Sequence, residues 1–350
     1  MEYYISKDLV ISPIQPEDCR AFADGFAAQG WHKPQSQYEG YLQEQQAGTR
    51  QVLAARWKGE AAGYLTLLPE ATAGPFAGKG WPEIVDFNVL EKFQRKGIGS
   101  RLMDCAEAEA AKTSRTVCLG VGLHSGYGPA QRLYVKRGYV PDGSGVWYQD
   151  KLLPPYTPCK SDDDLVLYLT KYLPEKVVRP IGQEELCAGL FHDFCRFQPV
   201  EKAWRKAEGH WEIQDVCYTD RWGNGEPERI SGIFRRLLAE GGQVWGAFLD
   251  GRLKGFCAVE GRLKGSQGQY ADMAELQVSY DCRGQRLGRE LFQKAVQSGR
   301  ALGAEKLYIS AHSAAGPMAF YKAMGCVEAE EPDPCHAAAE PCDVQMEYRL

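Results

Sequence analysis

The feature that most constrains the fold of this chain is a glycine-containing turn that occurs twice. In the first half, residues 94–99 join an apolar run at 84–90 to a helix-like stretch at 100–111. In the second half, residues 283–288 lie between an apolar segment and an amphipathic stretch in the same order. Glycines allow a tight turn that aims several backbone N–H groups at one point, and a helix N-terminus adds partial positive charge. We therefore expect each turn to cradle a phosphate group, although ordinary strand-to-helix turns share the pattern.

The segments around the two turns repeat as well. Each turn is preceded by a tight turn between two apolar runs, and it is followed by a His-Ser pair and a helix that contains a tyrosine. The repeated segments are residues 59–64 and 251–256, residues 124–125 and 312–313, and residues 133–138 and 320–325. The same elements in the same order indicate two copies of one structural unit in tandem.

The length of the chain agrees with two domains. Each half of the 350 residues is large enough to bury its own core. Residues 174–176 lack apolar periodicity, so we place the boundary there. The prediction is an N-terminal domain at 1–174 and a C-terminal domain, with an altered turn motif, at 175–350.

The two turns resemble those of the GNAT superfamily of acyl-CoA-dependent N-acyltransferases, whose signature is Gln or Arg, two residues, Gly, one residue, and Gly or Ala. The resemblance covers nearly the whole chain. It implies an α/β (α+β) fold of two tandem GNAT-like domains, each with a mixed, mostly antiparallel central sheet flanked by helices. It also implies an N-acetyltransferase that uses acetyl-CoA as the acyl donor substrate and acts on a small-molecule or peptide amine.

One departure from the signature concerns the second copy. Arg286 stands where the first motif glycine is expected. The cost of a non-glycine residue there depends on whether the position needs a positive φ, and a guanidinium that clears the phosphates could pair with one of them. The second domain is therefore expected either to bind acyl-CoA or to be a degenerate copy. A regulatory protein that binds acyl-CoA without turnover is the alternative function.

The resemblance also implies which residues contact the coenzyme. Backbone N–H groups at the end of each central strand polarise the acetyl carbonyl, and the turns hold the phosphates. In the first half these residues are Asn88, Val89, Gln94, Arg95, Lys96, Gly97, Ile98, Gly99, Ser100 and Ser125. In the second half they are Gln277, Val278, Arg283, Gly284, Gln285, Arg286, Leu287, Gly288 and Ser313. Many relatives carry Asn at the two outlying serine positions, so the contacts of Ser125 and Ser313 depart from the family pattern.

Acyl transfer from a thioester to an amine requires a deprotonated amine, a polarised carbonyl and a proton for the departing thiolate. The resemblance implies that Tyr134 and Tyr321, each in the helix after the repeated His-Ser pair, supply this proton as general acids. A tyrosine at either position could equally pack its ring in the core.

Glu83 and Asp272 are the candidate general bases. Some relatives place a catalytic glutamate six positions before the strand end, which is marked here by Val89 and Val278. Strand alternation predicts that Glu83 and Val89 share one face and that Asp86 lies on the other. Each carboxylate could instead lie at the surface or bind a cationic substrate, and many relatives act without a dedicated base.

Composition argues against several other classes of protein. The net charge of −5 with scattered Lys and Arg argues against a nucleic-acid partner, and no apolar run approaches the roughly 18 residues of a membrane span. The N-terminus lacks a secretory pattern and the twelve cysteines are widely spread, so we expect reduced cysteines in a cytoplasmic protein. We expect no metal site, because the cluster of Cys326, Cys335, His336 and Cys342 fits no standard zinc spacing and is interpreted as an irregular surface loop.

Two further expectations concern segments outside the turns. Residues 187–240, which in the resembled family lie in the acceptor-binding part, are expected to form a long helical segment. This segment carries Arg196, Trp204, Arg205, Trp211 and Trp222. A dinucleotide-binding Rossmann domain is the remaining alternative, but it requires a third spaced glycine and a later acidic residue that neither half supplies well. The acceptor amine and the oligomeric state are left open.

Overall fold

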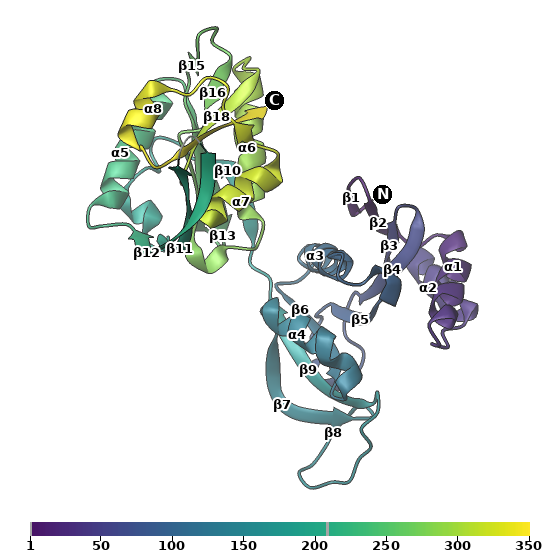
Figure 1. Cartoon of the computed structure of the whole chain (residues 1–350). Helices are drawn as coiled ribbons and strands as arrows, with labels where there is room; N and C mark the ends of the chain where they lie inside the picture. The colour runs from purple at the N-terminus through teal and green to yellow at the C-terminus, as the bar shows by residue number, and fades with distance from the viewer. Residues whose placement is uncertain (1, 208–209) are drawn as a thin grey trace. The chain divides into compact units, whose positions relative to one another are not determined.

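The computed structural model describes residues 2–207 and 210–350. The chain divides into two compact units, Met1–Pro174 and Glu175–Leu350, which we call the first unit and the second unit (Figure 1). Residue 1, where the first predicted domain begins, and residues 208–209, within the segment predicted to be helical, lie outside the described residues. Each unit has its own buried core.

The first unit is built on one mixed sheet with the strand order β1-β2-β3-β4-β5-β6-β9-β7-β8. β5 and β6 run parallel, and the other strand pairs of this sheet are antiparallel. The strands are β1 Tyr4–Ile5, β2 Leu9–Pro13, β3 Gln51–Trp57, β4 Glu60–Leu68, β5 Glu83–Val89, β6 Thr116–Gly122, β7 Val140–Tyr148, β8 Lys151–Leu152 and β9 Leu165–Tyr172. The helices are α1 Pro16–Ala28, α2 Gln35–Ala47, α3 Ile98–Ala110 and α4 Gly128–Lys136.

Local sequence explains how the helices of the first unit begin and pack. Pro16 occupies the first turn of α1, where a missing N–H costs little, and the Asp18 carboxylate accepts a hydrogen bond from the Gln15 backbone N–H at 2.8 Å. Figure 1 shows α1 and α2 on one side of β3 and β4, with α3 on the other. Phe22 of α1 packs its ring 5.2 Å from that of Tyr64 in β4. The first half of the sheet is therefore covered on both faces.

The second unit repeats this plan with its strands divided among three sheets. Their strand orders are β10-β13-β14-β17, β15-β16-β18-β20-β19 and β11-β12. The strands are β10 Lys176–Pro180, β11 Phe197–Ala207, β12 His210–Arg221, β13 Gln243–Leu249, β14 Arg252–Val259, β15 Leu263–Lys264, β16 Tyr270–Asp272, β17 Glu275–Val278, β18 Lys306–Ala311, β19 Val327–Glu328 and β20 Val344–Arg349. The helices are α5 Glu226–Ala239, α6 Leu287–Ala301, α7 Ala315–Met324 and α8 Pro334–Ala339. The predicted fold class, with mostly antiparallel sheets flanked by helices, is confirmed in both units.

The expectation of a long helical segment at residues 187–240 is wrong. β11 and β12 pair as an antiparallel hairpin, and helix α5 begins only at Glu226. Pro199 lies within β11 and would interrupt a helix, while Gln198 and Val200 on either side of it are both buried. This alternation of buried and exposed residues is typical of a strand with one covered face. The acceptor-side segment of the second unit is therefore mainly a β-hairpin.

The central strand of the first unit, β5, contains a β-bulge. Its register against β4 shifts between the pair Tyr64↔Asn88 and the pair Thr66↔Val85, so that β5 holds one extra residue there. Asp86, in this stretch, has a positive φ of 47°. An extra residue locally bends the strand and increases its twist.

The bulge overturns the expected facing of two side chains. A one-residue shift reverses the alternation of side chains along a strand, so Glu83 and Val89 lie on opposite faces rather than on one. Glu83 shares its face with Asn88 and Tyr64, and Asp86 also reaches Tyr64, whose hydroxyl donates to its carboxylate at 2.6 Å. The prediction that Glu83 and Asp86 occupy different faces is therefore wrong.

Both central strands leave their parallel neighbour part-way along. In the first unit, the parallel pairing of β5 with β6 involves Glu83 and Ile84. In the second unit, β16 pairs in parallel with β18, whereas β17, which is separated from β16 by two residues, pairs with β14 in another sheet. In each unit the C-terminal part of the central strand thus borders a gap on the side that its parallel neighbour has left.

Candidate active site

The two glycine-containing turns have the same backbone conformation. In the first unit, Arg95 and Gly97 have positive φ values of 59° and 78°, and Gly97 is the N-cap of α3. In the second unit, Gly284 and Arg286 have positive φ values of 79° and 67°, and Arg286 is the N-cap of α6. Each turn uses two left-handed residues at the same two places, one glycine and one arginine, in opposite order. Arg286 therefore occupies a position that does require a positive φ, and the turn forms there nonetheless.

Gly97 and Gly284 are needed for their dihedral angles and not for lack of space. A side chain in the left-handed region costs about 1–2 kcal/mol, so each turn holds one strained arginine. A Cβ atom added to Gly97 or to Gly284 would meet no heavy atom within 4 Å. The open space at the start of each helix fits the approach of a phosphate group to the unpaired backbone N–H groups.

Glu83, at the start of β5, has the environment of a group that exchanges protons near neutral pH. Its side chain is half-buried and forms no hydrogen bond with a described residue. Burial and the nearby Asp150 carboxylate raise the pKa of Glu83 to about 7, although Arg50 opposes the change. A carboxylate with this pKa can both accept and release a proton at pH 7.

Asp86, three residues further along β5, is held in its ionised form. Its carboxylate lies 2.7 Å from the Lys33 ammonium, and these two side chains are 17% and 19% exposed. Further hydrogen bonds reach the carboxylate from Gln37, Tyr41, Tyr64 and Asn88. Burial alone would raise the pKa of Asp86, but Lys33 and the neighbouring hydroxyl groups outweigh it and lower the pKa. The lone pairs of Asp86 are therefore engaged within the protein.

Tyr134 and Tyr321 lie at matching places in helices α4 and α7. They are 6% and 7% exposed, and each belongs to the core of its unit. Burial raises the pKa of both phenols well above the usual value, so both hydroxyl groups stay protonated at neutral pH. Each hydroxyl group is therefore available as a proton donor at neutral pH.

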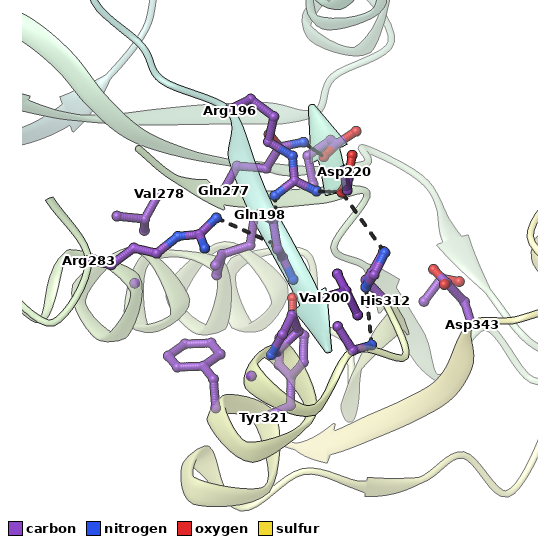
Figure 2. A pocket seen from close by; sticks show the side chains of 18 of the residues that line it. Arg196, Gln198, Val200, Asp220, Gln277, Val278, Arg283, His312, Tyr321 and Asp343 are labelled. Atoms are coloured by element: carbon purple, nitrogen blue, oxygen red, sulfur yellow. Dashed lines mark hydrogen bonds and ion pairs between the residues drawn. The ribbon is translucent and has the colours of Figure 1, made fainter. Parts of the chain in front are cut away.

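The second unit contains a cavity of about 1700 Å³. Its walls come from the turn at 283–288, strand β17, the hairpin β11–β12, and the segment at 339–343. Figure 2 shows Arg283 of the turn and Asp343 on opposite sides of this cavity, and Tyr321 of α7 is also among the lining residues. We call the turns at 94–99 and 283–288 the first and the second cradle. The cavity therefore extends from the second cradle to the hairpin β11–β12, which stands where an acceptor-binding helix was expected.

The hairpin is tied to the loop after β18 by a charged network. The Arg196 guanidinium donates to Gln198 Oε1 at 2.9 Å and forms an ion pair with Asp220. His312 Nε2 lies 3.9 Å from Asp220, and His312 Nδ1 accepts a hydrogen bond from the Ala314 backbone N–H at 3.1 Å (Figure 2). Burial lowers the pKa of His312. Both ring nitrogens of His312 thus face groups of the protein.

The two serines predicted to contact the coenzyme differ in exposure. Ser125 in the first unit is exposed. Ser313 in the second unit is only 2% exposed, because β11 covers it: its hydroxyl accepts a hydrogen bond from Arg205 at 2.7 Å, and its carbonyl accepts one from the Trp204 N–H at 2.8 Å. The hydroxyl group at this position is open to a ligand in the first unit and engaged in the second.

Three carboxylates, from Glu275, Glu340 and Asp343, line the cavity, and the Arg196 and Arg229 guanidinium groups lie near Glu275. Glu275 in β17 accepts a hydrogen bond from the Gln277 amide at 2.9 Å, and burial raises the pKa of Glu275. Glu340 and Asp343 both line the cavity, and burial together with a hydrogen bond to Glu340 raises the pKa of Asp343 to about 8. Proximity to a cationic group would favour the ionised form of these carboxylates.

Asp272, the predicted base of the second unit, is separated from this cavity. Its side chain is 0% exposed and is not part of the cavity wall. Its carboxylate forms an ion pair with Lys264, and its Oδ2 lies 2.7 Å from His336 Nε2. Burial would raise the pKa of Asp272, but these two partners outweigh it and lower the pKa. His336, by contrast, does line the cavity.

Several residues of these sites were not found from the sequence. Lys33 gave no signal, because its partner Asp86 is far away in the chain. Glu275 could have been found, because it occupies the place of Asp86 in the repeat. His336 was assigned to an irregular surface loop, whereas the structure places it in α8 against Asp272. Within the described part of the chain, no group of three or more His, Cys, Asp and Glu side chains is arranged to hold a metal ion.

The family of the chain follows from the repeated sites. The family model described as Acetyltransferase (GNAT) family matches residues 18–139 and 207–326. The chain belongs to the GNAT acetyltransferase family. The two matches confirm that this GNAT protein is a tandem form, and its family uses acyl-CoA. The Rossmann alternative is thereby excluded.

Solved structures similar to this GNAT protein are acetyltransferases of about half its length. Nourseothricin acetyltransferase is 17% identical, with a TM-score of 0.39, and the match covers 50% of this chain and 98% of that chain. RimL, a ribosomal L7/L12 alpha-N-protein acetyltransferase solved with coenzyme A, is 13% identical, with a TM-score of 0.39 and coverage of 49% and 98%. Ard1 from Thermoplasma volcanium is 20% identical, with a TM-score of 0.36 and coverage of 48% and 99%. The search of curated proteins found no match. None of the helices in the described residues has the length and apolar character required to span a membrane.

Proposed function

We propose that this GNAT protein is an acetyl-CoA-dependent N-acetyltransferase that acts on a primary amine. The observation that carries the proposal is the continuity of the cavity in the second unit, whose lining extends from the turn at 283–288 along β17, including Glu275, to Asp343. The turn, which includes Arg283, suits the anionic coenzyme, and the carboxylates suit an ammonium group. The thioester and the amine then meet beside the strand that lies between these two ends.

In the first unit, the turn at 94–99 binds the phosphates of acetyl-CoA, and the backbone N–H groups of Asn88 and Val89 polarise the acetyl carbonyl. Glu83 accepts a proton from the acceptor ammonium. Its raised pKa of about 7 supports this role, because a base is most effective when its pKa is close to the working pH. Tyr134 keeps its proton until the thiolate forms and then donates it.

In the second unit, the turn at 283–288 binds the phosphates, and the backbone N–H groups of Gln277 and Val278 polarise the carbonyl. Tyr321 is the proton donor to the thiolate, and its place on the cavity wall supports this role. Glu275 and Asp343 attract the ammonium form of the acceptor. The two turns have the same backbone conformation in spite of Arg286, and this supports coenzyme binding in both units.

A regulatory protein that binds acyl-CoA without turnover is the alternative from another class. Such a protein needs the cradle but no proton acceptor with a pKa near 7 and no protonated tyrosine beside the thioester. The environments of Glu83 and Tyr134 therefore favour turnover over binding alone.

Calorimetry with acetyl-CoA on the full chain and on its Gly97→Glu variant tests the proposal. We expect two sites to fall to one, because the new carboxylate repels the phosphates in the first cradle. Gly48→Glu is the matched control: Gly48 also has a positive φ, of 76°, and open space around it, but it ends α2 away from the turn. Release of the coenzyme thiol with a panel of primary amines then measures turnover. An intact chain that binds no acetyl-CoA would contradict the proposal, and binding without thiol release would favour the regulatory alternative.

A further inference from the structure

The second unit holds a histidine–carboxylate pair that has no role in the function described so far. His336 lies in α8, beyond the residues that the family model matches, and it lines the cavity. Its Nε2 lies 2.7 Å from Oδ2 of Asp272. Asp272 is ionised, and an ionised carboxylate only accepts hydrogen bonds, so Nε2 carries the ring hydrogen. In the neutral imidazole, the other ring nitrogen, Nδ1, then carries a lone pair.

The imidazole ring of His336 is held in place by the elements around it. It stacks on Tyr308 with ring centroids 5.6 Å apart and an interplanar angle of 29°. The helix that carries it starts at Asp333, whose side chain accepts a hydrogen bond from the Cys335 N–H at 2.8 Å. Nδ1 of His336 forms no hydrogen bond with any residue that the structure describes. His336 thus combines an imidazole oriented by a carboxylate, a second ring nitrogen without a hydrogen bond to a described residue, and a place among the lining residues of the cavity, which is the arrangement of a general base.

We propose that His336 is the general base of the second unit and that Asp272 is the positioning residue that orients it. This inference rests on the proposed acetyltransferase function. Nδ1 takes one proton from the acceptor ammonium, and the freed lone pair forms the C–N bond to the acetyl carbon while the C–S bond of acetyl-CoA breaks. The thiolate takes the proton of Tyr321, the phenolate takes one of the two protons on the new amide nitrogen and leaves the amide N–H, and the imidazolium releases its proton to water.

His312 and Asp272 are less suited to this role. Both ring nitrogens of His312 face protein groups, since Nδ1 accepts from the Ala314 N–H and Nε2 faces Asp220. Asp272 itself does not reach the cavity. The expected base position on the central strand thus acts on the cavity through His336.

The charged groups around His336 determine its pH dependence. The hydrogen bond with Asp272 raises the pKa of His336, burial opposes this, Lys264 of β15 lowers it and Asp333 raises it. The net direction is upward from the ordinary imidazole value. We therefore expect kcat/KM of the second unit to rise with pH through this raised pKa, and Asp272→Asn to move the inflection to lower pH.

The experiment uses the full chain with Gly97→Glu, so that turnover comes from the second unit. In this background we expect His336→Ala to lower kcat/KM by about 100-fold or more, and added imidazole to restore part of the loss. His336→Gln keeps a donor for Asp272 but has no basic nitrogen, so it should lose the same activity with an unchanged Tm. The control is His192→Ala, whose side chain is 85% exposed, and it should change neither quantity. The affinity for acetyl-CoA, measured by calorimetry, should be the same in all variants.

Three results would overturn the assignment of His336. The first is unchanged turnover in both variants, and the second is a loss that imidazole does not restore and that follows a lowered Tm. The third is acetyl-CoA binding without turnover by the second unit in the Gly97→Glu background. In that third case, thiol release by the unaltered chain would keep the proposed function for the first unit.

Discussion

The two units carry carboxylates at the same two positions of their central strands but place them in opposite environments. In the first unit, Glu83 has no hydrogen bond to a described residue and a pKa raised to about 7, while Asp86 forms an ion pair with Lys33. In the second unit, Asp272 is held by two basic side chains, while Glu275 faces the cavity with a raised pKa. The position of a carboxylate on a strand therefore does not decide its protonation. The cation that reaches it from another element does.

The largest effect is expected when the Lys33 ammonium is removed from Asp86 in the first unit. Loss of one partner of a buried ion pair typically costs about 3–5 kcal/mol, so Lys33→Met should lower the free energy of unfolding by about 3 kcal/mol, measured by urea denaturation. Lys92→Met is the control, because Lys92 and its partner Glu60 are 63% and 65% exposed, and it should cost less than about 1 kcal/mol. Equal losses of unfolding free energy in the two variants would show that Asp86 does not depend on Lys33 as a buried ion pair should.

The open carboxylate of the first unit is tested by Glu83→Gln. In a chain whose second cradle is blocked by Gly284→Glu, we expect kcat to fall about 100-fold while acetyl-CoA affinity stays constant, because the amide cannot accept a proton. Glu91→Gln, in the exposed turn after β5, is the control and should keep its turnover. Full activity of the Glu83 variant would remove the functional difference between the two strands.

A smaller effect on stability is expected when the left-handed arginine of either turn is replaced by glycine. Arg286→Gly relieves a left-handed side chain and should stabilise the second unit, but it also increases the entropy of the unfolded chain, so the net gain is expected to be about 0.5–1 kcal/mol. Arg95→Gly should give a similar gain in the first unit. Thermal unfolding measures both. A loss of stability in one unit alone would mean that its arginine makes a contact that outweighs the strain.

The smallest effect is the pH dependence of stability, which should have opposite signs at two histidines of the second unit. The raised pKa of His336 contributes stability that is present below about pH 6.5 and is lost as the pH rises through that pKa. The lowered pKa of His312 favours its neutral form, so stability is lost as the pH falls below about 6.5. His336→Gln should therefore be more destabilising at pH 5.5 than at pH 8. His312→Gln should be less destabilising at pH 5.5 than at pH 8. Each difference in the free energy of unfolding should be at most about 1 kcal/mol. Changes of the same sign would contradict these environments.

Local signals in the sequence were sufficient for much of the fold. The start of helix α1 is encoded locally, because Pro16 lies in its first turn and the Asp18 carboxylate accepts a hydrogen bond from the Gln15 N–H. The tandem arrangement could be predicted, because it is a repetition of such local signals. The hairpin β11–β12 was missed because its tryptophans and arginines were interpreted as one helical segment, although Pro199 within it argues for a strand.

The environments of the site residues depend on contacts that the sequence does not display. The bulge in β5 arises from its pairing with β4, so strand alternation alone gave the wrong face for Asp86. Asp272 has the same spacing to its strand end as Glu83, but Lys264 and His336 reach it from β15 and α8. Spacing along the chain therefore identified candidate bases without revealing which of them is open.

The exchanged order of glycine and arginine in the two turns has a consequence for how such sites are recognised. A search pattern that demands glycine at one fixed place accepts residues 94–99 and rejects residues 283–288, although both backbones follow the same path. The shared property is a pair of left-handed residues two positions apart, at least one of which is glycine. A pattern written in terms of that pair would recover diverged copies, and would separate a tolerated substitution from the loss of a binding site.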